Sequence, residues 1–256
     1  MNDKIIEKKM EDAKKVVKDA FDKYDIGDIS IAFTGGKDST LVLYIIFQVC
    51  QEEKLAIPQC FCIDEGDMFD EVKEFINKVE KVYGIDVKYI HNSDVSSVAG
   101  NEIGAIVKVN DLNKRNQNEV ERLGYEEEEF TYEPESFIGN HLMKTVTLNK
   151  YLEDNDVKAF FEGIRWDEQE ARMDEKYFSP RPGSEYSPEH MRVCPILHFT
   201  EKDVWDAIFQ YEIPICSLYK EGYRSLGVKS TTTKTEDKPA WEQDLENTNE
   251  RGGRRQ

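Results

Sequence analysis

The sequence predicts an α/β fold built on a parallel sheet of about five strands with helices on both faces. Two observations predict it. Short apolar runs alternate with helical patterns over the first 90 residues, an order typical of parallel sheets with right-handed crossovers. A glycine loop also joins the first apolar run directly to a buried helix, where parallel-sheet enzymes place ligands. The chain has 256 residues, which suits one large domain or a domain with an appendage.

The first six elements follow from hydrophobic spacing. Apolar side chains recur at helical spacing between Lys and Asp near the N-terminus, and Gly84 ends the third expected helix. The expected elements are a helix over 4–24, a strand over 29–33, a helix over 41–49, a strand over 59–63, a helix over 69–83 and a strand over 87–90.

Residues 91–136 differ in character. They are polar and contain the acidic run Glu126–Glu129, which predicts an insertion or a mobile lid. A helix is expected at about 138–154, followed by a strand over 157–162. The chain is then expected to loop past Pro180 and Pro182 until about 193–197. Thr200 and Asp203 form a start similar to a capping box for a helix that runs through Phe209.

Composition excludes several classes of protein. A net charge of −18 argues against nucleic-acid binding, because phosphate backbones require clustered Lys and Arg. No run approaches the roughly 20 apolar residues of a membrane span, and the charged N-terminal segment is unlike a secretory signal. Five cysteines without a C-x-x-C pair favour a reducing compartment over disulfides or a metal cluster. We therefore expect a cytoplasmic protein.

The loop Thr34-Gly35-Gly36-Lys37-Asp38-Ser39-Thr40 has the chemistry of an anion site. Its glycines allow the backbone to approach phosphate oxygens closely, and the following helix directs its N-terminal N–H groups and dipole at the ligand. A lysine adds charge and two residues add hydroxyl donors. The alternative is a turn that only connects a strand to a helix. The loop is neither a P-loop nor a dinucleotide G-x-G-x-x-G motif.

This loop resembles the S-G-G-x-D-S loop of the ATP pyrophosphatases (PP-loop proteins), the adenine nucleotide α-hydrolase superfamily, with Thr34 in place of Ser. Met143-Lys144-Thr145 and the segment 162–172 resemble the sulfate adenylyltransferase small subunit. The segment 218–227 is similar to FAD synthetases and phosphoadenosine phosphosulfate (PAPS) reductases, and Glu250-Arg251-Gly252-Gly253-Arg254 to a reductase-type tail. The chain is identified as a member of the PAPS reductase family.

The resemblance implies a Rossmann-like fold that binds ATP with Mg²⁺ and passes AMP to an acceptor with release of pyrophosphate. Sulfate is the leading acceptor. Alternatives are reduction of adenylyl sulfate or its 3′-phosphorylated form, AMP transfer to FMN, and a non-catalytic nucleotide-binding subunit. A GTPase-type partner subunit or a homo-oligomer is implied as well. Reduction requires a nucleophilic thiol, and no cysteine follows Cys216; Cys194 and Cys216 lie beside prolines in apolar surroundings, where thiols are buried and unreactive.

Within this scheme Arg165 follows a strand end and a glycine, so its planar guanidinium is expected to reach the cleft and bind an oxyanion; the alternative is a surface ion pair with Asp167 or Glu168. Asp38 is expected to orient the metal or to cap the helix. The predicted catalytic residues are Lys37, Asp38 and Arg165. The predicted nucleotide ligands are Thr34, Gly35, Gly36, Lys37, Ser39, Thr40 and, for ribose or adenine, Asp64. The predicted oxyanion ligands are Lys144, Arg165, Arg172 and Arg192.

Two domains are expected from these matches. An adenine-nucleotide-binding α/β domain is expected over 1–215, with the polar insertion at about 91–136. A C-terminal extension over 216–256 is expected to cover the active site.

Overall fold

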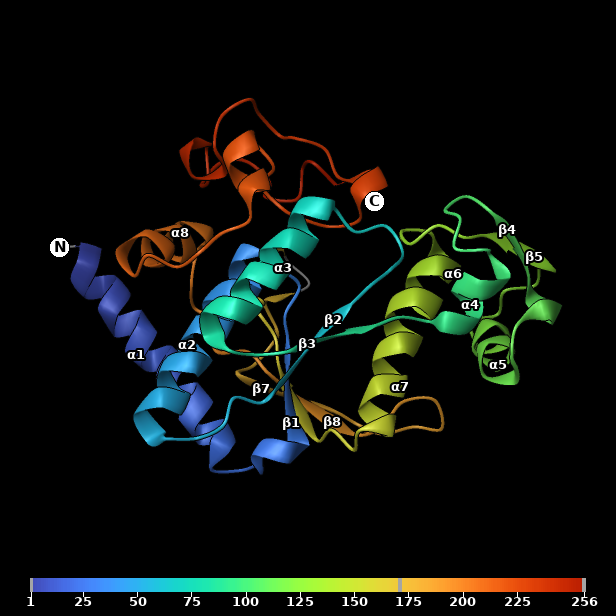
Figure 1. Ribbon diagram of the computed structural model, residues 1–256, viewed down its shortest axis with the longest axis horizontal. Helices are drawn as coiled ribbons and strands as arrows, with labels where there is room; N and C mark the ends of the chain where they lie inside the picture. The colour runs from blue at the N-terminus through green and yellow to red at the C-terminus, as the bar shows by residue number, and fades with distance from the viewer. Residues whose placement is uncertain (1, 170–171, 255–256) are drawn as a thin grey trace.

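A computed structural model describes residues 2–169 and 172–254 (Figure 1). Glu170 and Ala171, part of the 162–172 motif, lie outside the described residues. The central sheet has six strands in the order β3-β2-β1-β6-β8-β7. Every neighbouring pair is parallel except β7 and β8. The strands are β1 (Ile29–Ala32), β2 (Gln59–Ile63), β3 (Val87–Ile90), β6 (Ala159–Phe161), β7 (Phe178–Arg181) and β8 (His190–Val193).

The α/β class and the parallel sheet are confirmed, but the sheet has one strand more than expected. The additional strand is β7, which lies where we expected a loop past Pro180. Proline lacks the N–H that a central strand needs, so it argues against a strand from sequence alone. Here β7 is the outermost strand and pairs only with β8, with Pro180 opposite Met191. An edge position tolerates the missing donor.

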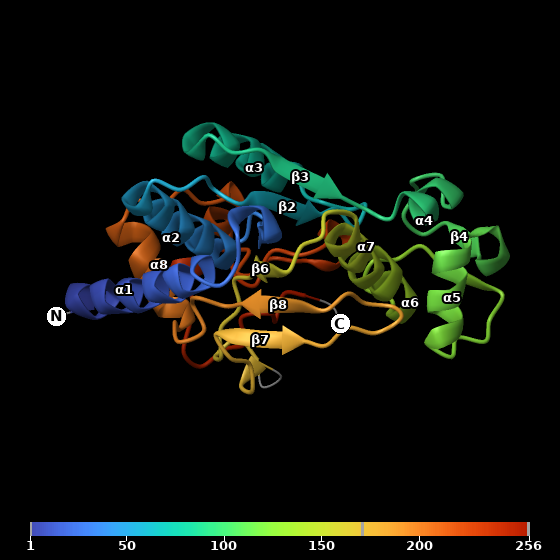
Figure 2. The same cartoon turned by 90° about the horizontal axis from the view of Figure 1, so that it is seen from below.

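Helices cover both faces of the sheet. Along β2 the side chains alternate: Cys60 and Cys62 belong to the large hydrophobic core, whereas Phe61 belongs to a smaller cluster with Tyr151. Figure 2 shows the helices that pack on the large core on one side of the strands and α7 on the other. The large core is closed by α1 (Asn2–Phe21), α2 (Lys37–Glu53), α3 (Asp70–Tyr83) and α8 (Glu201–Gln210), and the smaller cluster by α7 (Thr147–Asp154).

The insertion folds as a small unit with its own core, at the end of the molecule far from α1 (Figures 1 and 2). Val107, Val120 and Phe130 pack together there with apolar side chains from the helix that follows. A packed core distinguishes this segment from a structureless lid. Its elements are α4 (Ser93–Val98), β4 (Ile106–Lys108), η2 (Val109–Asp111), α5 (Lys114–Arg122) and β5 (Glu129–Thr131).

The helix expected at about 138–154 is present and contains a change of pitch. It begins as α6 (Phe137–Asn140), continues as the π-helical stretch η3 (His141–Val146), and returns to α-helical geometry in α7. π-Helical turns are rare and occur often at functional sites. The expected capping box of α8 is also present, since Thr200 and Asp203 each bond the other's backbone N–H.

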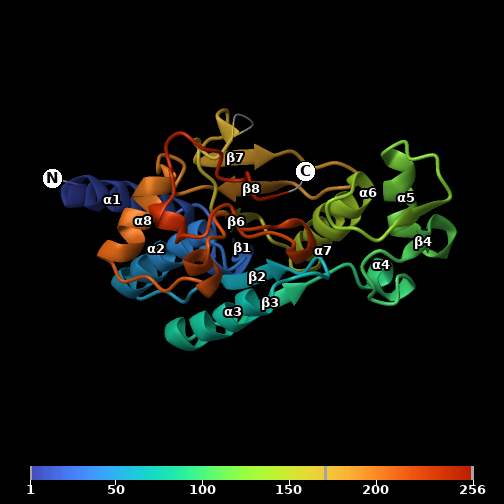
Figure 3. The ribbon, with the colours of Figure 1, turned by 90° about the horizontal axis from the view of Figure 1, so that it is seen from above.

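After α8 the chain runs through short 3-10 turns across the top of Figure 1, and Figure 3 shows the same segment from above. These turns are η5 (Ser217–Glu221), η6 (Lys229–Thr231) and η7 (Ala240–Glu242); a single 3-10 turn, η1 (Ile26–Asp28), precedes β1. Within the described residues, no helix has the length and apolar character needed to cross a membrane.

The strand order fixes where a ligand can bind. From β1 the chain moves outward to β2 and β3, then crosses back to place β6 on the other side of β1. The loops after β1 and β6 therefore diverge to opposite faces, and such a switch point is where open α/β sheets form their binding crevice.

Candidate active site

The loop between β1 and α2 is held in one shape by its glycines and hydroxyls. Gly35 has φ +73°, a conformation that favours glycine, and a Cβ there would lie 3.0 Å from Cγ1 of Val72. The Gly36 carbonyl accepts hydrogen bonds from the Thr40 amide at 2.9 Å and from the Ser39 and Thr40 hydroxyls at 3.0 Å and 2.8 Å. The loop thus presents the N-terminus of α2, an anion-attracting end.

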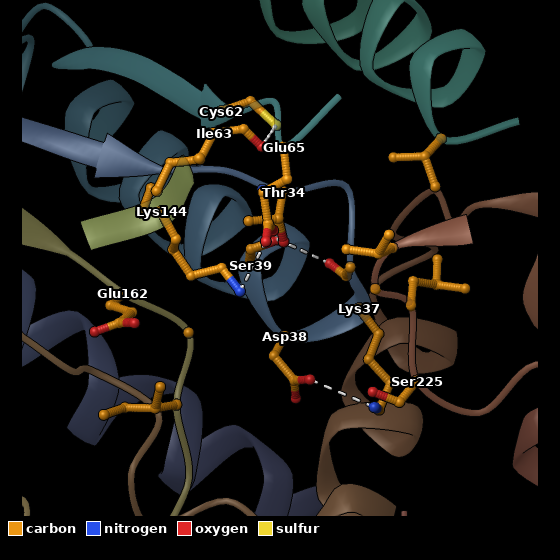
Figure 4. A pocket seen from close by; sticks show the side chains of 18 of the residues that line it. Thr34, Lys37, Asp38, Ser39, Cys62, Ile63, Glu65, Lys144, Glu162 and Ser225 are labelled. Atoms are coloured by element: carbon orange, nitrogen blue, oxygen red, sulfur yellow. Dashed lines mark hydrogen bonds and ion pairs between the residues drawn. The ribbon is translucent and has the colours of Figure 1, made fainter. Parts of the chain in front are cut away.

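The other side of the switch point touches this helix directly. A Cβ added to Gly163, just after β6, would lie 2.7 Å from both the Asp38 carbonyl carbon and the Ser39 amide nitrogen. Only glycine allows the two loops to approach this closely. Between them opens a cavity of about 330 Å³, seen from close by in Figure 4.

The cavity has a mixed lining of hydroxyls, carboxylates and cations. Thr34 and Ser39 line it from the loop, with their hydroxyl oxygens 3.3 Å apart. Lys144 enters from the π-helical stretch and forms an ion pair with Glu65 at 3.1 Å (Figure 4). Burial raises the pKa of the Glu65 carboxyl, an effect that Lys144 opposes. The ionisable residues of the lining are Lys37, Asp38, Cys62, Glu65, Asp67, Glu135, Lys144, Glu162, Glu168, Arg172, Tyr219, Glu250, Arg251 and Arg254.

Three guanidinium groups of this lining are poorly compensated. The Nε atoms of Arg172, Arg251 and Arg254 are buried and lack a hydrogen-bond partner among the described residues. The nearest carboxylate oxygen to Arg251 is that of Glu168, at 3.5 Å. Burial and the neighbouring Arg251 lower the pKa of Arg254. Buried donors without partners are costly, so this wall of the cavity is suited to an anion.

Lys37 lines the cavity, but its ammonium is paired with carboxylates of the protein. Its side chain is 1% exposed and extends away from the loop toward the C-terminal segment (Figure 4). The ammonium bonds to Oε1 of Glu250 and lies 3.4 Å from the Arg224 carbonyl oxygen and 3.4 Å from Oδ2 of Asp38. Although burial opposes the charge, Asp38 and Glu250 raise the pKa of Lys37. The charge expected on phosphate is thus neutralised by carboxylates.

Arg165, unlike Lys37, is not among the cavity-lining residues. Its guanidinium is 1% exposed and bonds to three carboxylates: Nη1 to Asp38, Nη2 to Glu250, and Nε to Asp167 at 2.9 Å. The ion pair with Asp167, the alternative to an oxyanion ligand, therefore forms, between a buried guanidinium and a carboxylate whose side chain is 37% exposed.

The remaining predicted residues divide between the cavity and its surroundings. Lys144 and Arg172 line the cavity, and so do Thr34, Gly36, Asp38 and Ser39. Gly35 lies against Val72 and is not part of the lining. The Thr40 hydroxyl donates to the Gly36 carbonyl oxygen. Asp64 accepts a hydrogen bond from the Gly66 amide at 2.9 Å, and its neighbours Ile63 and Glu65 line the cavity instead. Arg192 lies on β8, is not part of the lining, and forms an ion pair with Glu162 at 3.7 Å.

Glu250, Arg251 and Arg254 were not predicted as site residues. Their signal was present in the tail motif, which we used only for the resemblance. Glu201 and Arg224 were missed as well: they form a buried ion pair at 2.6 Å, and Glu201 lies 3.8 Å from Lys37. Such partners come together only through the tertiary fold, because 213 positions separate Lys37 from Glu250.

All five cysteines are buried and unpaired by disulfides, as expected for Cys194 and Cys216. Cys62 lines the cavity at the end of β2 but is 1% exposed. Burial, with a smaller contribution from Asp64, raises the pKa of its thiol to about 12. A thiol with this pKa supplies little thiolate near neutral pH.

Curated relatives share about a quarter of their aligned residues with this chain. A probable FAD synthase of Caenorhabditis briggsae is 25% identical over 229 residues, which are 89% of this chain and 34% of the relative. Sulfate adenylyltransferase subunit 2 of Mycobacterium tuberculosis is 27% identical over 209 residues, or 74% of this chain and 57% of the relative. The chain thus spans about a third of the worm protein and rather more than half of the mycobacterial one.

Solved structures share the fold at lower identity. Yeast FAD synthetase in complex with FAD superposes with a TM-score of 0.65 at 15% identity, covering 99% of this chain and 91% of that one. Candida glabrata FMN adenylyltransferase with FMN and an ATP analogue gives 0.62 at 19% identity, covering 89% and 65%. Candida auris PAPS reductase gives 0.59 at 15% identity, covering 86% and 90%.

A family-level match covers most of the chain. The family model for the phosphoadenosine phosphosulfate reductase domain matches residues 28–234. That range begins just before β1, contains the glycine loop and the loop after β6, and extends into the segment after α8, but ends before Glu250, Arg251 and Arg254. With the PP-loop, the switch-point cavity and this match together, the chain belongs to the phosphoadenosine phosphosulfate reductase family.

Proposed function

We propose that this chain is an adenylyltransferase that passes AMP from ATP to an acceptor bearing an oxyanion, with release of pyrophosphate. The observation that carries the proposal is the wall formed by Arg172, Arg251 and Arg254, which lines the same cavity as the loop and the start of α2. One cavity thus offers two places for negative charge. A transfer reaction between two anionic substrates requires both.

In this scheme each wall has a separate task. The hydroxyls of Thr34 and Ser39 and the N-terminus of α2 bind the β- and γ-phosphates. The guanidinium groups bind the acceptor oxyanion and hold it against the α-phosphorus despite the repulsion between the two anions. The acceptor oxygen forms a bond to the α-phosphorus, the bond to the β-phosphate oxygen breaks, and pyrophosphate leaves.

Magnesium is the expected companion of ATP and would neutralise charge on the phosphates. Asp38, the expected protein ligand, already pairs with Arg165 and Lys37. The described residues contain no group of three metal-ligating side chains.

FMN is the acceptor that we place first, ahead of the sulfate favoured by the sequence motifs. Two points support this order. The match to FAD synthases covers 89% of the chain, against 74% for sulfate adenylyltransferase subunit 2. Apolar side chains such as Met68, Leu226 and Val228 also line the cavity. A sulfate ion has no apolar surface that could pack against them, whereas FMN has. With sulfate as acceptor, a second subunit would be the natural companion, and co-purification from the host would reveal it.

Sulfonucleotide reduction is the less favoured reaction because of the thiols. It needs an accessible thiolate, whereas Cys62 is buried at the edge of the cavity. The pKa of Cys60, the next cysteine on the same strand, is raised by burial to about 12.

The test is a product assay with competing acceptors. Purified protein is incubated with ATP, Mg²⁺ and either FMN or sulfate, and pyrophosphate is quantified together with FAD by mass spectrometry. We expect equimolar FAD and pyrophosphate from FMN. Pyrophosphate release that requires sulfate and does not occur with FMN would identify sulfate as the acceptor. No pyrophosphate with either acceptor, or thioredoxin-dependent sulfite from adenylyl sulfate, would refute AMP transfer.

A substitution pair connects the assay to the cavity. Arg254→Gln should lower kcat/KM for the acceptor by roughly 10- to 100-fold, the range for loss of one charged hydrogen bond. Arg181→Gln is the matched control. Arg181 lies on β7, does not line the cavity, and forms an ion pair with Glu175, with an N–O distance of 2.6 Å. Equal effects of the two substitutions would contradict the proposed wall.

A further inference from the structure

Glu250 holds two cations that come from different parts of the fold. One carboxylate oxygen bonds to the ammonium of Lys37, in the first turn of α2, and the other bonds to the guanidinium of Arg165, after β6. Glu250 is buried, with 8% exposure. We call Lys37, Arg165 and Glu250 the carboxylate clasp.

The clasp is surrounded by further buried charges that fix the same segment. Arg224 bonds to Glu201 through Nε and Nη2 and also donates to the Asp244 carbonyl oxygen at 3.1 Å and the Leu245 carbonyl oxygen at 3.2 Å. The chain leading to Glu250 is therefore held from α8. Burial would raise the pKa of the Glu250 carboxyl, but Lys37 and Arg165 lower it to about 2, so it stays charged.

Two of the three cavity arginines, Arg251 and Arg254, follow Glu250 closely in the sequence. Arg251 and Arg254 line the cavity with Glu250. The Gly253 carbonyl accepts a hydrogen bond from the Thr233 amide at 2.8 Å, and the Arg254 guanidinium lies against Gly227, where a Cβ would be 2.9 Å away. The residues between 250 and 254 thus have one anchor on each side.

We propose that Lys37 and Arg165 are positioning residues, not phosphate ligands: through Glu250 they hold residues 244–254 closed over the cavity and so place Arg251 and Arg254 against the acceptor anion. This inference rests on the proposed function only for what the arginines bind. The closure itself requires no nucleotide.

The first test therefore uses no ligand. In the wild-type protein, hydrogen exchange at the Thr233 and Arg254 amides should be slow without ATP. In Glu250→Gln, which keeps the shape and removes the charge, we expect trypsin to cleave after Arg251 at least tenfold faster. Glu246→Gln removes the same charge from an exposed position of the same segment and should leave cleavage unchanged. Fast exchange in the wild type, or equal cleavage of both variants, would overturn the clasp.

A second variant separates positioning from phosphate binding. Lys37→Met should release the tail, but no more than Glu250→Gln does because Arg165 still holds Glu250. The double variant should release it no further than Glu250→Gln alone, since the Lys37 pair is lost in both. A Lys37→Met protein with a protected tail and weakened pyrophosphate binding would instead identify Lys37 as a phosphate ligand and overturn the proposal. Tighter ATP binding by Glu250→Gln would also overturn the proposal, because it would show that the Glu250 carboxylate competes with ATP for Lys37 and Arg165.

The kinetic readout distinguishes the clasp from the function on which it depends. Glu250→Gln should raise KM for the acceptor by about tenfold and leave KM for ATP within about twofold. A purely structural role would raise both KM values by similar factors, and that result would count against positioning. Tail release without any transferase activity in the wild type would leave the clasp standing and remove the proposed function.

Discussion

At the scale of single residues, this site is organised by how buried charges are compensated. Lys37 and Arg165 are surrounded by carboxylates, whereas Arg172 and Arg254 retain guanidinium nitrogens without partners. Burying a charge costs free energy unless it is paired. The first two cations are therefore already satisfied by the protein, and the second two are left for a ligand.

The pH dependence of stability should report Glu250. Its pKa is about 2 in the folded protein and 4.5 in its ordinary state, so ionised Glu250 stabilises the fold above pH 4.5. That contribution, roughly 3 kcal/mol, should disappear as the pH falls from about 5 to about 2. Glu250→Gln lacks it. We expect urea unfolding to show a steeper loss of stability in the wild type, and parallel pH profiles would contradict this charge state.

Residue chemistry alone predicted the loop but not its partners. Thr34, Gly36 and Ser39 line the cavity as the motif suggested, because loop and helix are adjacent in sequence. The ion pairs of Lys37 and Arg165 could not be deduced, since their partner Glu250 is distant in the chain and looks like an ordinary tail residue.

At the scale of elements, the closest approach is between the end of β6 and the start of α2. Gly163→Ala would place a methyl group 2.7 Å from the backbone of Asp38 and Ser39. We expect it to destabilise the fold by roughly 1–3 kcal/mol, the range for overpacking, and to weaken ATP binding because the loop must shift. Gly27→Ala is the control, since nothing lies within 4 Å of its added Cβ. Similar unfolding midpoints for both variants would refute the tight contact.

Elements with a single strong period were predictable, and those with mixed signals were not. β2 and β3 begin and end where the apolar runs do. β7 was missed because Pro180 argues against a strand unless its edge position is known. The π-helical stretch has no sequence signal that we recognised, although Lys144 projects from it into the cavity.

At the scale of the whole molecule, like charges repel across the surface. The net charge is −18, and such self-repulsion destabilises a compact state. Raising NaCl from about 0.05 M to about 1 M shortens the screening length to about 3 Å. We expect the melting temperature to rise by several degrees, because screening weakens repulsion between exposed carboxylates more than it weakens buried pairs. A falling melting temperature in differential scanning calorimetry would show that exposed attractive pairs dominate instead.

The insertion also belongs to this scale. Its polar composition predicted an insertion or a mobile lid, and it did not reveal that Val107, Val120 and Phe130 share a core, in which Val107 and Phe130 meet because two short strands pair. Such a core is invisible to a search for long periodic segments. The division of the chain at residues 215 and 216 stays a proposal, supported by the cavity residues that the later segment supplies.

The distance in sequence between Lys37 and Glu250 has a consequence for biosynthesis. Domains fold during translation at about 5–20 residues per second, so the last sheet strand, ending at Val193, leaves the ribosome several seconds before Glu250 does. During that interval Lys37 and Arg165 lack Glu250 and share only the Asp38 carboxylate. Residues 244–254 would thus join the fold last, and a chain truncated before them would keep the sheet but lack the clasp.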